Sequence, residues 1–304
     1  MPPFAVDGLR SLRRAWRRKP ESKESSEILA SAGRPESDDA TCSAQARQED
    51  FPEWEMVSDT DELWSSAAGW GHQSIVETQL AKWPSFLDSV AATGPLGQSH
   101  EAATDAPADY ATHNTIMTFG YALGRAARGR DGLTVLDWGG GLGHYYVYAR
   151  ALFPDLPLDY VVKDLLPFCE VGPRLLPEVA FVTDADEALS KSYDFVFASS
   201  SIHYERDQYQ LLGRLCDSAT AWLLVTRTPF VEASDDFLVV QRPHQYGYLT
   251  EYPGWFMNRR RFIEFVAARG FNVEREFLVA EQPYVPNAPE TAHYLGFLFR
   301  RSSS

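Results

Sequence analysis

The sequence predicts an α/β protein with a doubly wound, mostly parallel sheet, a helical segment before it and an antiparallel hairpin at its C-terminal end. Three observations predict this class. After residue 132, short apolar runs rich in β-branched and aromatic residues alternate with helical stretches, as in a parallel sheet covered on both faces. A glycine-rich turn follows the first of these runs. Two alternating strand patterns close the chain after its last helix.

The elements follow one another at regular intervals. Parallel strands are expected at residues 133–137, 158–163, 179–183, 193–199 and 219–226. Helices are expected at about 142–153, 165–175, 186–190 and 205–217. Asn258 can cap a last helix over residues 259–269, which Gly270 ends. The closing strands are residues 272–281 and 292–300, joined by a proline-rich loop over 283–289.

The chain before residue 132 lacks this alternation. Residues 1–50 contain a basic cluster between Arg10 and Lys19 and then a stretch rich in Ser, Glu and Asp, which is typical of a disordered tail. Residues 1–20 fit either a solvated basic tail or a short amphipathic helix on an anionic membrane surface. Residues 51–131 predict a helical cap, with a helix around 75–83 interrupted at Pro84 and a second over 110–128.

Composition limits the function classes. The net charge of −14 argues against non-specific binding to nucleic acid, because the phosphate backbone would be repelled. The cysteines, Cys42, Cys169 and Cys216, are widely spaced without a C-x-x-C pair, which argues against a disulfide framework or a metal site. The chain has neither an apolar run of about 18 residues nor the apolar core of a signal peptide. We therefore expect a soluble cytoplasmic protein.

The glycine-rich turn is the most informative motif. Asp137 and Trp138 precede four glycines: Gly139, Gly140, Gly141 and Gly143. Glycines allow positive φ and bring backbone N–H groups close to a ligand. The dinucleotide fingerprint G-x-G-x-x-G would need a further glycine where this sequence has His144, so an NAD-dependent enzyme is the least favoured interpretation.

Other candidate ligand contacts follow the later strands, because ligands bind beyond the carboxyl ends of parallel strands. Asp164 follows the second strand, where its carboxylate can accept hydrogen bonds from both hydroxyls of a ribose. Asp184, or else Asp186, follows the third strand and can bond an adenine amino group. Ser199 ends the fourth strand, and the stretch from Ser199 through His203 to Tyr204 is expected to lie beneath the cofactor and face a substrate.

The spacing of the glycine turn is similar to motif I of the class I S-adenosylmethionine (SAM)-dependent methyltransferases. Over about residues 51–301 the chain resembles a bacterial family of such enzymes whose substrate is unassigned. The resemblance is carried by residues 54–55, 81–84, 113–115, 136–146, 198–201, 226–229, 240–243 and 296–299. It implies a Rossmann-like methyltransferase fold with SAM as cofactor. The residues expected at the cofactor are Asp137, Gly139, Gly140, Gly141, Gly143, Asp164, Asp184 and Ser199.

Methyl transfer to a hydroxyl or carboxyl group benefits from a base, and histidine has a suitable pKa. His203 is the first candidate and His144 the second; alternatively, either one only hydrogen-bonds the cofactor or the backbone. Glutamine is also admissible at position 203 in the family, which argues against an essential base there.

A long insertion at residues 228–257 is expected to form a lid, with a short strand over 237–241. The residues expected at the substrate are Arg227, Arg242, His244, Tyr246 and Tyr252. The two arginines can pair with an anionic acceptor, or else with the surplus carboxylates of the protein.

The sequence therefore predicts a tail over 1–50, a helical cap over 51–131 and a SAM-binding domain over 132–304. The predicted function is methyl transfer from SAM to a small-molecule or glycan acceptor, with O-methylation favoured. The alternative is a non-catalytic scaffold that binds SAM or a nucleotide through the same fold. The lid, rich in Tyr, His and Arg, favours the enzyme.

Overall fold

The computed structural model describes residues 52–58, 64, 69–97 and 108–302, which all belong to one compact unit beginning at Pro52. The predictions for residues 1–50, including the membrane-surface helix, lie outside the described residues. The division into a cap and a SAM-binding domain at residue 132 stays a prediction.

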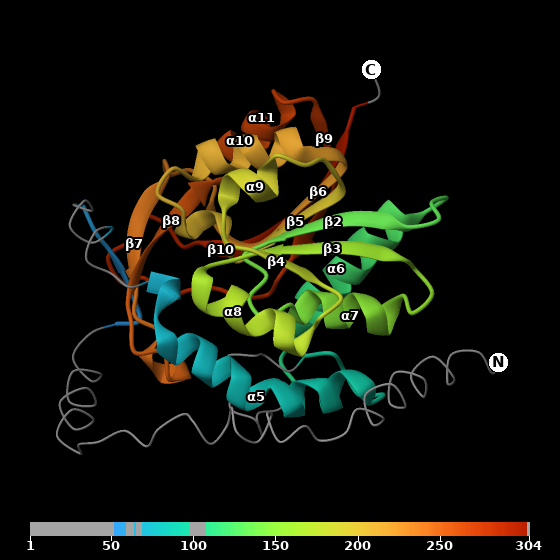
Figure 1. Ribbon diagram of the computed structural model, residues 1–304. Coiled ribbons are helices and arrows are strands. Elements are labelled where there is room, and N and C mark those ends of the chain that lie inside the picture. Colours follow the sequence, from blue (N-terminus) through green and yellow to red (C-terminus); the bar gives the residue numbers. More distant parts are fainter. Residues whose placement is uncertain (1–51, 59–63, 65–68, 98–107, 303–304) are drawn as a thin grey trace, which may run out of the picture. The chain divides into compact units, whose positions relative to one another are not determined.

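A parallel sheet forms the centre of the unit (Figure 1). Its strands, in spatial order, are β4 (Ala180–Val182), β3 (Leu158–Lys163), β2 (Leu133–Trp138), β5 (Tyr193–Ser199) and β6 (Ala219–Val231). Next to β6 lie β10 (His293–Arg301) and β9 (Phe271–Leu278), both antiparallel to their neighbours. The predicted doubly wound sheet and its closing hairpin are confirmed.

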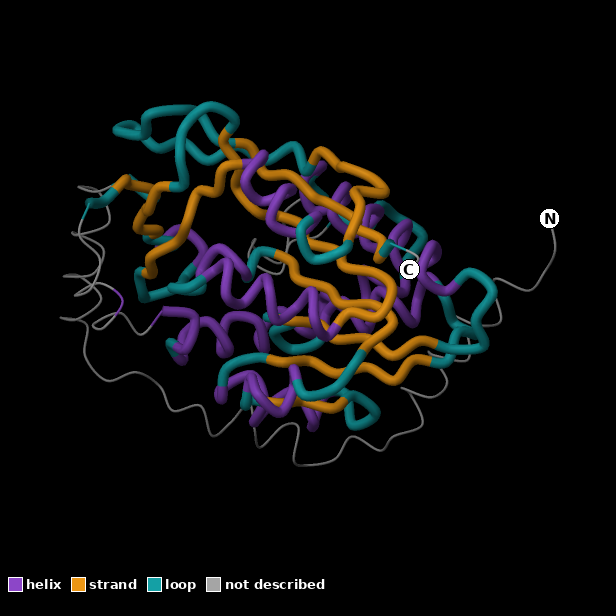
Figure 2. The backbone as a smooth tube through the Cα atoms, turned by 90° about the horizontal axis from the view of Figure 1, so that it is seen from above, coloured by secondary structure: helices purple, strands orange, loops and turns teal. Residues whose placement is uncertain are grey.

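Helices cover both faces of this sheet, as Figures 1 and 2 show. One face carries α9 (Ala185–Leu189), α10 (Gln208–Ser218) and α11 (Arg259–Ala267). The other carries α6 (Tyr110–Ala127), α7 (His144–Leu152) and α8 (Leu166–Leu175), with α5 (Gln73–Ala91) packed against α7 and α8.

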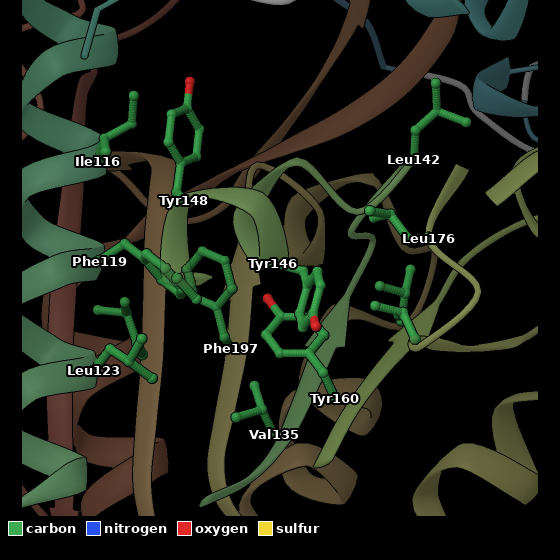
Figure 3. Packing of buried hydrophobic residues seen from close by; sticks show 14 of the residues in the cluster. Ile116, Phe119, Leu123, Val135, Leu142, Tyr146, Tyr148, Tyr160, Leu176 and Phe197 are labelled. Carbon is green, nitrogen blue, oxygen red and sulfur yellow. The ribbon is translucent and has the colours of Figure 1, made fainter. Parts of the chain in front are cut away.

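Strand alternation explains these two layers. Neighbouring residues of a strand point to opposite faces, so Val135 joins the core beneath α6 and α7 while Leu136 joins the core beneath α10 and α11. Phe197 of β5 likewise packs against Phe119 of α6, with ring centroids 5.0 Å apart (Figure 3). Burial of both faces accounts for the nearly continuous apolar runs in the sequence.

The predicted interruption of the first helix at Pro84 is wrong, because α5 continues to Ala91. Trp83 and Phe86 on either side of the proline are both buried, so tertiary packing outweighs the lost backbone hydrogen bond. The hydroxyl of Ser85 also donates to the carbonyl of Lys82, at 2.9 Å.

Half of residues 228–257, the segment expected to form a lid, lies in strands. Strand β6 continues past the predicted end at Thr226 to Val231, and β7 (Phe237–Gln241) pairs with β8 (Tyr252–Asn258). The short strand predicted over 237–241 is confirmed. Strand β1 (Trp54–Met56) adds to the outer edge of β7, while β8 runs parallel to the end of β6. The insertion therefore extends the central sheet as a wall of strands.

Candidate functional site

Asp137 lies at the carboxyl end of β2, where the strand enters the glycine turn. Its side chain is buried, and the hydroxyl of Tyr160 on β3 donates to Oδ2 at 2.9 Å. Burial raises the pKa of Asp137 to about 7; the Tyr160 hydrogen bond opposes this rise and the nearby Asp164 charge adds to it. The carboxyl group therefore acts as a structural support behind the turn.

The glycines of the turn are required by the backbone and by close contacts. Gly139, Gly141 and Gly143 have φ values of 72°, 58° and 86°, which side chains rarely tolerate. A Cβ on Gly139 would lie 2.5 Å from the Cβ of Ser201, and one on Gly140 would lie 2.6 Å from Oδ2 of Asp137. Any larger residue would push this turn out of place.

Asp164 links the end of β3 to the same turn. The backbone N–H of Gly141 donates to its Oδ2 and that of Leu165 donates to its Oδ1, both at 2.7 Å. Burial raises the pKa of Asp164, against the effect of these two hydrogen bonds. Each carboxylate oxygen has a second lone pair, so the group can still accept hydrogen bonds from ligand hydroxyls.

A cavity of about 350 Å³ opens in front of the turn. It brings together residues from the ends of β2, β3 and β5 and from α5, α6 and α7. Its lining includes Gly139, Gly140, Gly141, Asp164, Ser199, Phe86, His144, Tyr145, Tyr148 and Phe168. The hydroxyls of Tyr145 and Ser199 lie 2.9 Å apart and fix one wall. We call this space the turn cavity.

A second cavity, of about 470 Å³, adjoins the turn cavity. It lies among β1, β7, β8 and the segment between β9 and β10. The residues that line both cavities are Trp70, Ser200, Tyr204, Arg227 and Tyr252. We call the second space the outer cavity and these shared residues the junction.

Three aromatic rings form much of the junction. Trp70 stacks on Tyr252 with centroids 4.8 Å apart, and Tyr204 lies 5.4 Å from Trp70 and 5.0 Å from Tyr252. Beside them, Ser200 and Arg227 follow a pair of neighbours on β5 and β6, Ser199 and Thr226. Both Ser200 and Arg227 have a φ of 50°, an unfavourable conformation for residues with side chains.

Most of the predicted cofactor residues lie together. Gly139, Gly140, Gly141, Asp164 and Ser199 line the turn cavity.

The other three predicted cofactor residues line neither cavity. Asp137 and Gly143 stand behind the turn and shape it. Asp184 caps α9, where its Oδ1 accepts from the N–H of Glu187 at 2.8 Å, and Asp186 pairs with Arg214.

The two candidate bases have different surroundings. His203 is fully buried, lines neither cavity, and packs between the rings of Tyr204 and Tyr294, with centroids 4.0 and 6.2 Å away. Neither of its ring nitrogens has a hydrogen-bond partner. Burial, and then the charge of Arg227, lower the pKa of His203 to about 3. His144 lines the turn cavity, edge-on to Trp83 and Phe86.

The predicted substrate residues are likewise divided. Arg227 and Tyr252 belong to the junction, and Tyr246 lines the outer cavity. His244 lines neither cavity. Arg242 also lines neither, and it pairs with Glu55 at 3.0 Å and with Glu251 at 3.2 Å. For Arg242, the structure thus shows the pairing with the protein's own carboxylates.

Sequence analysis did not single out Trp70 or Glu281, and it included Tyr204 only as the last residue of the stretch expected to face a substrate. Trp70 is one of several tryptophans in an aromatic-rich segment, and Tyr204 directly follows the histidine that drew attention. Glu281 lies beside the proline-rich loop, and no local pattern distinguishes it.

Comparison of the sequence with models of protein families, and with curated proteins, gave no match. Solved structures gave matches at low identity. Magnesium protoporphyrin IX methyltransferase from Synechocystis PCC 6803 with bound SAM is 13% identical, with 89% of this chain and 100% of that chain covered and a TM-score of 0.42.

Two further structures match in the same range. The 1,6-didemethyltoxoflavin-N1-methyltransferase of Burkholderia thailandensis, with its substrate and S-adenosylhomocysteine bound, is 17% identical over 62% of this chain and 80% of that chain, with a TM-score of 0.40. A pericyclic reaction enzyme is 14% identical over 75% of this chain and 64% of that chain, with a TM-score of 0.40. At this identity the similarity concerns the fold alone.

The strand order β4–β3–β2–β5–β6–β10–β9 independently gives the Rossmann-like class I methyltransferase fold. Among the described residues, no group of three or more His, Cys, Asp and Glu side chains is placed to hold a metal ion. In the same part of the chain, every helix is too short or too polar to cross a bilayer.

Proposed function

We propose that this protein is a SAM-dependent methyltransferase that binds SAM in the turn cavity and a small-molecule or glycan acceptor in the outer cavity, with O-methylation as the reaction. The observation that carries the proposal is the junction. Because Trp70, Ser200, Tyr204, Arg227 and Tyr252 line both cavities, ligands in the two cavities would meet there.

The residues of the turn cavity suit SAM. Gly139, Gly140 and Gly141 line the cavity without side chains, so a ligand can come close to the backbone of the turn. Asp164 is held by two backbone N–H groups and keeps lone pairs for the ribose hydroxyls. The aromatic faces at the junction favour a positively charged sulfonium.

SAM supplies a methyl group that is already activated, so the protein's task is mainly to orient the acceptor and to exclude water. Trp70 and Tyr252 present aromatic surface at the junction for this purpose. Arg227 presents a guanidinium group that is hydrogen-bonded to Glu281. A non-catalytic scaffold would need only the turn cavity, and the adjoining outer cavity therefore supports an enzyme.

Calorimetric titration of SAM, S-adenosylhomocysteine and NAD tests the proposal. The wild type should bind SAM and S-adenosylhomocysteine, and not NAD. Asp164→Ala should weaken SAM binding at least about tenfold, because hydrogen bonds to a charged group are lost.

Asp184→Ala is the matched control. This aspartate also follows a strand of the sheet but caps α9 outside the cavity, so SAM affinity should stay the same. Circular dichroism would confirm that both variants are folded. Absence of SAM binding to folded wild-type protein would refute the proposed function.

A further inference from the structure

The charged side chains that line the outer cavity already have partners in the protein. Among the described lining residues these are Glu53, Arg227 and Glu281. Arg227 contacts Oε2 of Glu281 through Nη2 at 3.2 Å and through Nε at 3.3 Å. Glu53 accepts from the amides of Gln241 and Gln245, at 2.9 and 2.6 Å. The cavity therefore has no cation left uncompensated for an anionic ligand.

The reacting end of an acceptor must lie at the junction, and Arg227 is the charged residue there. An anionic group at this place would have to compete with Glu281 for the guanidinium. A cationic group would likewise have to compete with the guanidinium of Arg227 for the carboxylate of Glu281. Both charged classes of acceptor are therefore disfavoured at the reacting position.

The Arg227–Glu281 pair is also where the backbone is strained. Among the described residues, the non-glycine residues with positive φ are Ser200, Arg227 and Ala280, at 50°, 50° and 66°. Two belong to the junction and the third directly precedes Glu281. Such conformations cost on the order of 1–3 kcal/mol each and concentrate at functional sites.

Glu281 is held by a well-anchored segment rather than by a free loop. Its carbonyl accepts from the N–H of Tyr294 at 3.0 Å. Further along, Asn287 makes two hydrogen bonds with the backbone of Met56 on β1, at 2.8 and 2.9 Å. Glu290 accepts from the backbone N–H groups of residues 232, 233 and 234. We call residues 279–292 the strap.

A hydroxyl group matches the Arg227–Glu281 pair, because it can accept from the guanidinium and donate to the carboxylate at once. The separations of 3.2–3.5 Å within the pair are longer than the usual charge-assisted bond of about 2.7–2.9 Å. A hydroxyl therefore competes with a long contact rather than with an ideal ion pair. The rings of Trp70, Tyr252 and Tyr294 add flat surface to the same cavity.

We propose that the outer cavity selects an uncharged, ring-shaped acceptor that carries hydroxyl groups, and that Arg227 and Glu281 together bind the hydroxyl at the junction. This inference rests on the proposed function, because it names the acceptor class of the same site. The shared chemistry is an uncharged hydroxylated ring, and the ring is either aromatic or a sugar.

The inference is tested by measuring the binding of four probes to the full chain with ligand-observed NMR. This measurement does not require methyl transfer. Catechol and methyl β-glucopyranoside are the uncharged aromatic and sugar probes, benzoate is the anionic probe and benzylamine the cationic probe. At least one uncharged probe should bind the wild type more tightly than both charged probes.

Two variants test whether Arg227 and Glu281 are responsible for the preference. Glu281→Gln should weaken the preferred uncharged probe about tenfold, through loss of a charged acceptor. It should also strengthen benzoate binding, because Arg227 loses its carboxylate partner. Arg227→Gln should weaken the uncharged probe without strengthening benzoate. Glu274→Gln, which removes the Glu274–Arg125 pair elsewhere, should change neither.

The inference is overturned if benzoate or benzylamine binds the wild type most tightly, if none of the probes binds, or if Glu281→Gln leaves the preference unchanged. Titration of SAM into the same samples separates this failure from failure of the proposed function. SAM binding without binding of an uncharged probe refutes the acceptor class alone.

Discussion

Gly140 packs directly against the carboxyl group of Asp137: a Cβ on Gly140 would lie 2.6 Å from Oδ2 and 2.7 Å from Cγ of the aspartate. The carboxyl group has little room to move away from such a Cβ, since it is buried and hydrogen-bonded to the hydroxyl of Tyr160. The glycine turn and the end of β2 therefore form one unit, whose shape depends on the absence of a single side chain.

Gly140→Ala should consequently displace the turn. We expect a loss of about 1–3 kcal/mol in the free energy of unfolding, as for other overpacked sites, together with loss of SAM binding. Urea unfolding and calorimetry measure the two effects. Gly94→Ala is the control, because a Cβ there meets nothing within 4 Å. Normal SAM affinity in Gly140→Ala would show that the turn is not the cofactor site.

The Asp137→Asn variant should gain stability relative to the wild type as the pH rises. The folded-state pKa of Asp137 is raised from 3.8 to about 7, so between these values the folded state binds more protons than the unfolded state. Stability contributed by this group is therefore lost as the pH rises through that window. Asparagine removes the titration and still accepts from Tyr160.

The measurement for Asp137→Asn is urea unfolding of both proteins at several pH values from 5 to 8. The stability of the variant minus that of the wild type should increase with pH, by on the order of 2–4 kcal/mol in total. A difference that stays constant with pH would mean that Asp137 is ionised throughout.

His203→Gln should have the opposite pH dependence. The folded-state pKa of His203 is lowered from 6.5 to about 3, so below pH 6.5 the unfolded state binds more protons and the stability falls as the pH falls. Glutamine abolishes this loss. The stability of the variant relative to the wild type should therefore improve as the pH drops from 7 towards 5.

SAM affinity of His203→Gln should equal that of the wild type, because the buried ring lines neither cavity. The same unfolding series and calorimetry apply. If SAM binding is lost from a folded His203→Gln protein, His203 takes part in the cofactor site after all.

Glu290→Gln should loosen the strap. The Glu290 carboxylate accepts from three consecutive backbone N–H groups, and these hydrogen bonds lower its pKa. The amide replaces one of the two accepting oxygens with a donor. Hydrogen exchange of residues 282–290 should become about tenfold faster. Glu264→Gln on α11 is the control. If it accelerates exchange of residues 282–290 as much as Glu290→Gln does, the anchoring role of Glu290 is contradicted.

The sequence allowed the parallel strands to be predicted well because each of them is a local apolar run. The sequence did not show which strands pair when they lie far apart in the chain. The wall made by β7, β8 and the end of β6 depends on partners such as β1, which no local pattern joins to β7. The helix through Pro84 survives for a related reason, since the burial of Trp83 and Phe86 is set by other elements.

The site shows the same division. The glycine turn and Asp164 could be predicted because strand-end residues of a parallel sheet meet at one edge. That rule places a residue but not its side chain: Asp184 caps a helix and the ring of His203 is buried, so neither lines a cavity. Trp70 and Glu281 come to the junction from segments far apart in the chain, so only the folded structure could reveal them.

Strand β1 has a consequence for the order in which the protein matures during synthesis. Glu53 and Gln241, which meet in the outer cavity, are 188 residues apart, and the β7 partner of β1 is made long after β1 has left the ribosome. Closing so long a loop is slow compared with folding of local elements. The outer cavity can therefore be completed only after β7 has been made, whereas the strands β2 to β5 beside the turn cavity are made earlier.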